Sequence, residues 1–124
     1  MMYTLDTNIL MYHLNDDDAE VSSFLERRFE TEIFFLPTIA IVEFLAFSEL
    51  TLESKYAFDA VVPFLRVVPL DYIIALTAGE LRSHYKLKLG DSVVAATALS
   101  KNSVLVTRNI RDFKNVPSLE VQSL

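Results

Sequence analysis

The sequence predicts an α/β domain in which helices cover both faces of a mostly parallel sheet of about five strands. Short apolar runs rich in β-branched and aromatic residues recur along the chain, and longer segments with helical spacing separate them. The runs are continuous rather than alternating, which is typical of strands buried on both faces. Together these observations favour a compact three-layer α/β/α arrangement.

The predicted strands lie at residues 2–5, 33–36, 67–70, 104–106 and, with a weaker pattern, 119–122. After the first strand, three aspartates at 16–18 mark a helix start, because negative charge stabilises a helix N-terminus. Thr38 is expected to cap a helix running to about residue 48, and Thr51 the next helix. Asp71 is expected to cap the following helix, and Asp91 or Ser92 to open the last long one, which runs to residue 101.

Composition limits the classes of protein that this chain can represent. With 124 residues, 52% of them hydrophobic, we expect one domain spanning residues 1–124. Only two glycines are present, which excludes a GxGxxG fingerprint and a Walker A loop, and the lack of cysteine excludes thiolate chemistry. There is no signal-peptide pattern, and the most apolar segment, 33–47, is too short to span a membrane. We therefore expect a cytoplasmic protein without membrane contact.

Charge is unevenly distributed along the chain. The net charge is −6 at pH 7, yet residues 82–124 hold seven basic and three acidic side chains. Charge alone leaves two interpretations open, a solvated basic face or a local contact with a polyanion.

Polar side chains follow two of the predicted strands, where sites form in open parallel sheets. These positions are Asp6, Thr7 and Asn8 after the first strand, and Thr107, Arg108 and Asn109 after the fourth. Taken alone, Asp6 is also explained as a turn or N-cap residue.

Glu43 stands in the apolar segment TIAIVEFLAF, with no polar stripe on its side of the predicted helix. A solvent-facing glutamate normally has polar neighbours, so this pattern predicts that Glu43 is buried. Because burial of an unpaired carboxylate is unfavourable, we expect a cation or a proton to accompany it.

Asp91 and Asp112 complete a set of four candidate carboxylates with Asp6 and Glu43. Each has a plain structural alternative, since Asp91 follows a glycine at a predicted helix start and Asp112 lies in a turn-like segment. Carboxylates that converge in a cleft repel one another and are stabilised by a divalent cation. Hard oxygen ligands suit Mg²⁺ or Mn²⁺, and such a centre suits phosphoryl transfer.

Four segments distributed over nearly the whole chain carry a family resemblance. They are, in order, YTLDTNIL, TIAIVEFLAF, LGDSVVAATAL and LVTRNIRDFKNVPSLEV. In sequence and in order they resemble the PIN domain family, and more closely its VapC-type ribonuclease toxins. The resemblance implies a compact α/β/α domain and Mg²⁺/Mn²⁺-dependent cleavage of RNA at an acidic active site.

By position, the resemblance makes Asp6, Glu43 and Asp91 the three core acidic residues, and Thr7 and Asn8 the polar pair that follows the first. Many family members have a fourth aspartate where this chain has Asn109. Asp112, three residues later, could serve instead. With one charge fewer, we expect one firmly bound metal ion.

The expected function is therefore that of a VapC-like toxin, an RNA endonuclease controlled by an antitoxin protein. Candidate contacts to the RNA backbone are Arg108, Arg111 and Lys114. A homodimer is expected from the apolar side chains around residues 44–47. One alternative is a PIN-like module that binds without cleaving. Another is a receiver-like Mg²⁺-binding signalling domain, although the paired acids and the Lys-Pro pair of that class are absent.

Overall fold

The computed structural model describes all residues from 1 to 124 and contains one five-stranded sheet. All four neighbouring pairs of strands are parallel, and the strand order is β3-β2-β1-β4-β5. The strands are β1 (Met2–Leu5), β2 (Ile33–Pro37), β3 (Arg66–Val68), β4 (Val104–Thr107) and β5 (Val121–Ser123). Each of the five predicted strands is present, with ends shifted by no more than two residues.

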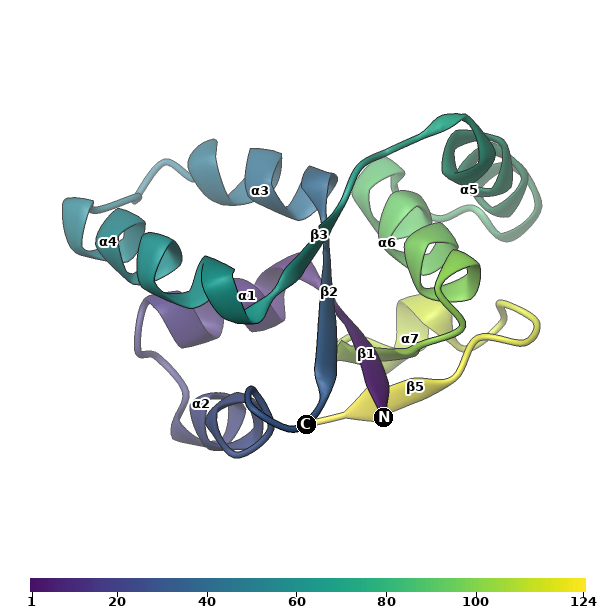
Figure 1. Cartoon of the computed structure of the whole chain (residues 1–124). Helices are drawn as coiled ribbons and strands as arrows, with labels where there is room; N and C mark the ends of the chain where they lie inside the picture. Colours follow the sequence, from purple (N-terminus) through teal and green to yellow (C-terminus); the bar gives the residue numbers. More distant parts are fainter.

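Helices cover both faces of this sheet, as Figure 1 shows, so the predicted three-layer α/β fold is confirmed. On one face lie α1 (Thr7–Leu14), α2 (Ala19–Glu26), α3 (Thr38–Leu45) and α4 (Leu52–Val61), which continues into the short η1 (Val62–Phe64). On the other face lie α5 (Tyr72–Tyr85) and α6 (Leu89–Ser100), while α7 (Ile110–Phe113) follows β4.

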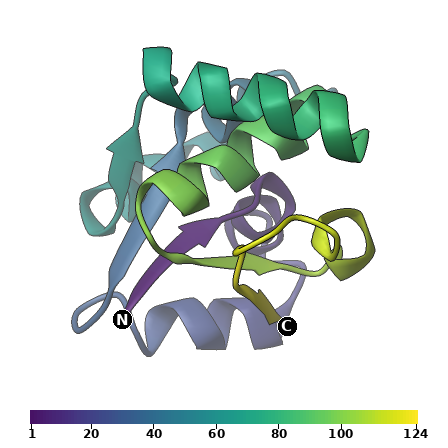
Figure 2. The same ribbon diagram turned by 90° about the vertical axis from the view of Figure 1, so that its right-hand side faces the viewer.

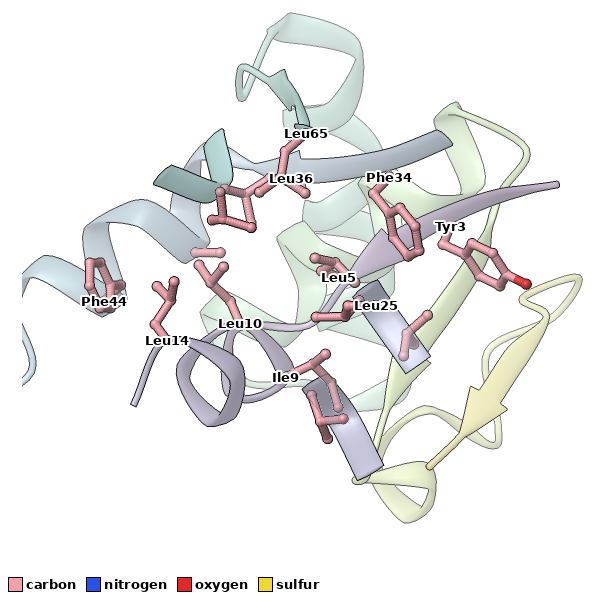
Figure 3. Packing of buried hydrophobic residues seen from close by; sticks show 14 of the residues in the cluster. Tyr3, Leu5, Ile9, Leu10, Leu14, Leu25, Phe34, Leu36, Phe44 and Leu65 are labelled. Atoms are coloured by element: carbon pink, nitrogen blue, oxygen red, sulfur yellow. The ribbon is translucent and has the colours of Figure 1, made fainter. Parts of the chain in front are cut away.

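Alternate residues of the central strands supply two separate cores. Phe34 and Leu36 of β2 pack toward α1 and α2, whereas Phe35 between them packs toward α5 and α6. Figure 3 shows Phe34 and Leu36 in the first core, together with Leu5 and Leu10. The continuous apolar pattern of the central strands is therefore explained, because their buried positions face helices on one side or the other, whereas the edge strands β3 and β5 are partly exposed.

Helix α6 lies between the sheet and α5, as Figure 2 shows. Its residues from 92 to 98 are all buried, and three of them are alanines, which allow close approach on several sides. This enclosure holds the first turn of α6 firmly beside the sheet.

The observed helix starts agree with the predicted ones in three places and differ from them in two. Asp18, Thr51 and Asp71 each accept hydrogen bonds from the first turn of the following helix, as predicted. The Thr38 cap is wrong: Pro37 is the N-cap of α3, and the Thr38 hydroxyl accepts from the backbone N–H of Leu70 instead. That helix also ends at residue 45 rather than about 48.

The start of α6 is the second difference. The helix begins at Leu89 and its N-cap is Lys88, so it opens two residues earlier than expected. Asp91 therefore lies inside the first turn and is not a cap. The prediction took the aspartate itself as the start signal, although the backbone is already helical before it.

The order of the strands determines where a site can form. The chain passes from β1 through β2 to β3 on one side, and then places β4 and β5 on the other side of β1. The carboxyl ends of β1 and β4 thus flank the point where the strand order reverses, the usual place for a site in an open parallel sheet. None of the helices combines the length and apolar character that crossing a membrane requires.

Candidate functional site

Asp6 lies directly after β1 and is only 5% exposed. One carboxylate oxygen, Oδ1, accepts a 2.8 Å hydrogen bond from the backbone N–H of Thr7, so Asp6 is the N-cap of α1. The other oxygen, Oδ2, accepts a 2.7 Å hydrogen bond from the Thr107 hydroxyl at the end of β4. The cap interpretation is correct, and the same side chain also stands at the reversal point of the sheet.

Thr7 links the first strand end to α3. Its hydroxyl donates a 2.7 Å hydrogen bond to Oε1 of Glu43. Thr7 itself is buried. The contact holds the Glu43 carboxylate at the same edge of the sheet as Asp6.

The expected burial of Glu43 is wrong, because the residue is exposed. Helix α3 packs inward through Ala40 and Phe44, and the side that carries Val42, Glu43 and Leu45 faces outward. The apolar neighbours of Glu43 are themselves in solvent, with Val42 60% and Leu45 51% exposed. The apolar pattern of the helix predicts burial on all sides, whereas its outer side is uncovered in the structure.

Gly90, in the first turn of α6, contacts the Glu43 side chain and was not a sequence candidate. A methyl group on its Cα would lie 2.9 and 3.0 Å from the two Glu43 carboxylate oxygens. One signal could have drawn attention to it. Gly90 is one of only two glycines in the chain and stands within a helix, where glycine is unfavourable.

Asp91, the next residue, is half-buried in α6. Burial first, and then the negative charges of Asp6, Asp112 and Glu43, together raise the pKa of its carboxyl to about 6, against the opposing effect of Lys88. Asp91 therefore interacts electrostatically with each of the three other predicted carboxylates.

The pKa of Asp6 is also raised, first by burial. Hydrogen bonds from Thr107 and Thr7 oppose this effect, while the charges of Glu43 and Asp112 add to it. Four carboxylates that are distant in the sequence thus gather at one edge of the sheet. Their mutual repulsion is the main electrostatic feature of the site.

Asp112 and Asn109, the two alternatives for the fourth position, lie beside each other at α7. The Asn109 side-chain amide donates a hydrogen bond to Oδ2 of Asp112. The backbone N–H of Asn109 donates to the Thr107 hydroxyl at 2.9 Å. Of these two residues, Asp112 is the one that supplies negative charge to Asp6 and Asp91, and Asn109 orients the Asp112 carboxylate.

This fold agrees with comparisons to known proteins. The sequence profile of the PIN domain family matches residues 3–119. The chain belongs to the PIN domain family. Ribonuclease VapC2 of Rickettsia felis is 27% identical over 131 residues, covering 99% of this chain and 98% of that protein.

Solved structures similar to this PIN domain include several toxin–antitoxin complexes. VapBC2 from Rickettsia felis, bound to a DNA fragment from its promoter, has a TM-score of 0.85 at 24% identity and covers 100% of this chain and 99% of its own. A toxin-antitoxin complex from Klebsiella pneumoniae has a TM-score of 0.78 at 27% identity and 94% coverage of both chains. VapBC-1 from nontypeable Haemophilus influenzae has a TM-score of 0.79 at 25% identity, covering 99% and 98%.

The remaining predicted residues of this PIN domain lie around the carboxylates. Asn8 is exposed on the first turn of α1, while Arg111 and Lys114 are exposed on and just after α7. Arg108 is engaged elsewhere, because its guanidinium forms a 2.7 Å ion pair with Asp18 and lies over the Tyr12 ring. Arg111 and Lys114 form no ion pair and are the freer cations.

The donor set fits the divalent cation that PIN nucleases in general require. Carboxylate oxygens are hard ligands, and a bound cation would relieve the repulsion that raises the pKa values of Asp6 and Asp91. In this conformation no three acidic or histidine side chains are close enough to coordinate one ion together. Ligation partly through water suits such spacing, because Mg²⁺ commonly retains several of its waters.

The site is separate from the main cavity of the molecule. That cavity, of about 520 Å³, lies between α1, α2 and α4 and includes His13, Phe29 and Phe64. None of the four carboxylates lines it.

Proposed function

We propose that this PIN domain is a Mg²⁺- or Mn²⁺-dependent endoribonuclease and the toxin of a toxin–antitoxin pair. The observation that carries the proposal is the electrostatic cluster of Asp6, Glu43, Asp91 and Asp112 at the reversal point of the sheet. The similarity to Ribonuclease VapC2, which spans both chains almost completely, supports RNA as the substrate.

In this proposal, Asp6, Glu43 and Asp91 hold the cation directly or through water, and Asp112 is an outer ligand. A bound divalent cation supplies Lewis-acid chemistry, making water more acidic and offsetting charge on a phosphate. The lower charge at the fourth position, with Asn109 beside Asp112, favours one firmly bound ion rather than two.

The chain's own residues then have distinct tasks. Thr107 and the Thr7 backbone fix Asp6, and the Thr7 hydroxyl fixes Glu43, so that these carboxylates are oriented before substrate arrives. Asp91 is held in the first turn of α6, and a bound cation would favour its ionised form. Asn8 and Asn109 provide polar support at the rim.

Exposed basic side chains near the carboxylates contact the RNA backbone in this proposal. Arg111 and Lys114 extend from the segment that carries Asp112 and have no acidic partner. Arg108 would reach a phosphate only after releasing Asp18. Phosphate contacts of this kind position the strand without reading its sequence.

The decisive experiment measures cleavage of RNA by the purified protein with Mn²⁺ or Mg²⁺ and with chelator. We expect metal-dependent cleavage by wild type and none by Asp6→Asn or Asp91→Asn, with circular dichroism spectra unchanged. Asp59→Asn, an exposed aspartate on α4, is the matched control and should cleave normally. RNA binding without cleavage by wild type would favour the alternative of a non-catalytic binding module.

We also propose an antitoxin protein as partner and a homodimer as the assembly. The similar solved structures are toxin–antitoxin complexes, which supports the first. Exposed apolar side chains on α3 and α5 support the second. They are Val42, Leu45, Tyr72, Ile73 and Leu76. Light scattering of the purified chain should give twice the 14.1 kDa mass, and a short DNA-binding protein encoded beside this gene would support the antitoxin.

A further inference from the structure

Gly90 is glycine for a reason of space and not of backbone conformation. Its φ is not positive, so a residue with a side chain could adopt the same backbone. Glycine is also less favourable than alanine in a helix. What excludes a side chain is the Glu43 carboxylate, whose two oxygens and Cδ would lie 2.9 to 3.1 Å from a methyl group at this position.

The other glycine of the chain provides an internal comparison. Gly79 lies within α5, also at a φ that is not positive, and a methyl group there would have no neighbour within 4 Å. The two helical glycines therefore differ in one respect. Only Gly90 faces another side chain.

The atoms that a methyl group would meet belong to the end of a flexible, exposed side chain. The fold can therefore accommodate alanine at position 90 by turning Glu43 away. Such a turn would move Oε1 from the Thr7 hydroxyl, 2.7 Å distant, and would take the carboxylate away from Asp91. The substitution should therefore change the position of the Glu43 carboxylate and leave the packing of the core unchanged.

We propose that Gly90 is a positioning residue whose bare Cα lets the Glu43 carboxylate stand between Thr7 and Asp91. The metal part of this inference rests on the proposed function, in which Glu43 helps to hold the cation. The close approach of α3 and α6 thus serves the site, because a side chain at the contact would displace one of the acidic groups.

The placement of Glu43 is tested first without metal. The carboxyl ¹³C resonance of Glu43, assigned by its loss in Glu43→Gln, should shift in Gly90→Ala and stay unchanged in Gly79→Ala. Both variants should retain the wild-type circular dichroism spectrum. An unchanged Glu43 resonance in Gly90→Ala would overturn the inference, whatever the protein does with metal or RNA.

Mn²⁺ binding, followed by calorimetry, tests the metal part. Gly90→Ala should weaken Mn²⁺ binding on the order of tenfold, as substitutions that misplace a ligand commonly do, while Gly79→Ala binds as wild type. Equal affinity of wild type and Gly90→Ala would overturn the positioning role. If wild type binds no Mn²⁺, the proposed function and the metal role of Gly90 both fail, and the resonance still decides the placement separately.

Rescue by a shorter side chain distinguishes positioning from a general structural effect. Glu43→Asp withdraws the carboxylate by one methylene and leaves room for a methyl group at position 90. In that background, Gly90→Ala should cause no further loss of Mn²⁺ affinity. A full additional tenfold loss would show that Gly90 acts other than through Glu43 and would overturn the proposal.

Discussion

The hydroxyl of Thr107 donates a 2.7 Å hydrogen bond to Oδ2 of Asp6, joining two residues that are 101 positions apart. Both side chains are buried, and they lie at the carboxyl ends of the two neighbouring strands at which the order of the sheet reverses. The same hydroxyl accepts from the backbone N–H of Asn109, which orients the segment that carries Asp112. Thr107 thus connects the buried carboxylate of Asp6 with the segment that carries the exposed Asp112.

Thr107→Val should therefore destabilise the fold. The substitution keeps the shape but leaves a buried carboxylate oxygen and a backbone N–H without their partner, which costs about 1–3 kcal/mol. Because this hydrogen bond lowers the pKa of Asp6, its loss should raise that pKa further. Urea unfolding with chelator measures the stability, and NMR titration measures the pKa.

Thr97→Val is the matched control for this effect. Thr97 is also a buried threonine, but its hydroxyl donates to the Val93 carbonyl within the same helix. The lost bond is local and involves no charge, so the loss of stability should be smaller. Equal losses of unfolding free energy in the two variants would show that the bond between Thr107 and Asp6 stabilises the fold no more than a local bond does.

Local patterns were sufficient to predict the sheet and the strand ends at which Asp6 and Thr107 lie. Asp6 and Thr107 were found because they follow apolar runs, and the carboxyl ends of parallel strands share an edge. Their hydrogen bond to each other could not be predicted, since it depends on β1 and β4 being neighbours despite the long separation in sequence.

The errors concern features that depend on packing between helices. Periodicity shows that the helix around Glu43 is apolar, but it does not show which sides the rest of the chain covers. Gly90 was missed for a related reason, because its role arises only where α3 approaches α6. The start of α6 at Leu89 likewise lacks a side-chain cap that a sequence could reveal.

The fourth acidic position can be assigned by comparing two substitutions. Asp112→Asn removes the charge that acts on Asp6 and Asp91, whereas Asn109→Ala removes only a hydrogen bond to Asp112. Asp112→Asn should therefore reduce the rate of RNA cleavage more than Asn109→Ala. Initial rates at saturating Mn²⁺ measure both, and the reverse order would assign the position to Asn109.

The exposed cations near α7 should differ in their contribution to RNA affinity. Arg111→Gln and Lys114→Gln each remove a free cation, so each should weaken RNA binding and reduce the slope of log K against log salt by about 0.7. Arg108→Gln should alter affinity less, because its charge is already paired with Asp18. Binding is measured with the cleavage-deficient Asp91→Asn protein, and a larger effect of Arg108→Gln would show that the ion pair opens on RNA binding.

Asp91 makes the stability of the metal-free protein depend on pH in a defined direction. Its pKa rises from 3.8 to about 6 on folding, so between these values the folded state binds more protons than the unfolded state. Stability of the fold therefore falls as pH rises from about 4 to about 6, and the penalty remains in full above that range.

Asp91→Asn removes this penalty, so the metal-free variant should be more stable than wild type at pH 7. The full shift corresponds to about 3 kcal/mol, and we expect on the order of 1 kcal/mol because Asp91 is only half-buried and solvent screens its charge. The difference should vanish near pH 4, and Asp59→Asn should show no such dependence. Urea unfolding with chelator from pH 4 to 7 measures this difference in stability.

Mn²⁺ should reverse the order of stability of the two proteins, since an ion that binds the folded wild type stabilises it by mass action. A wild type that is more stable than Asp91→Asn at pH 7 with chelator present would mean that Lys88, the one cation acting on Asp91, outweighs burial and the three neighbouring carboxylates.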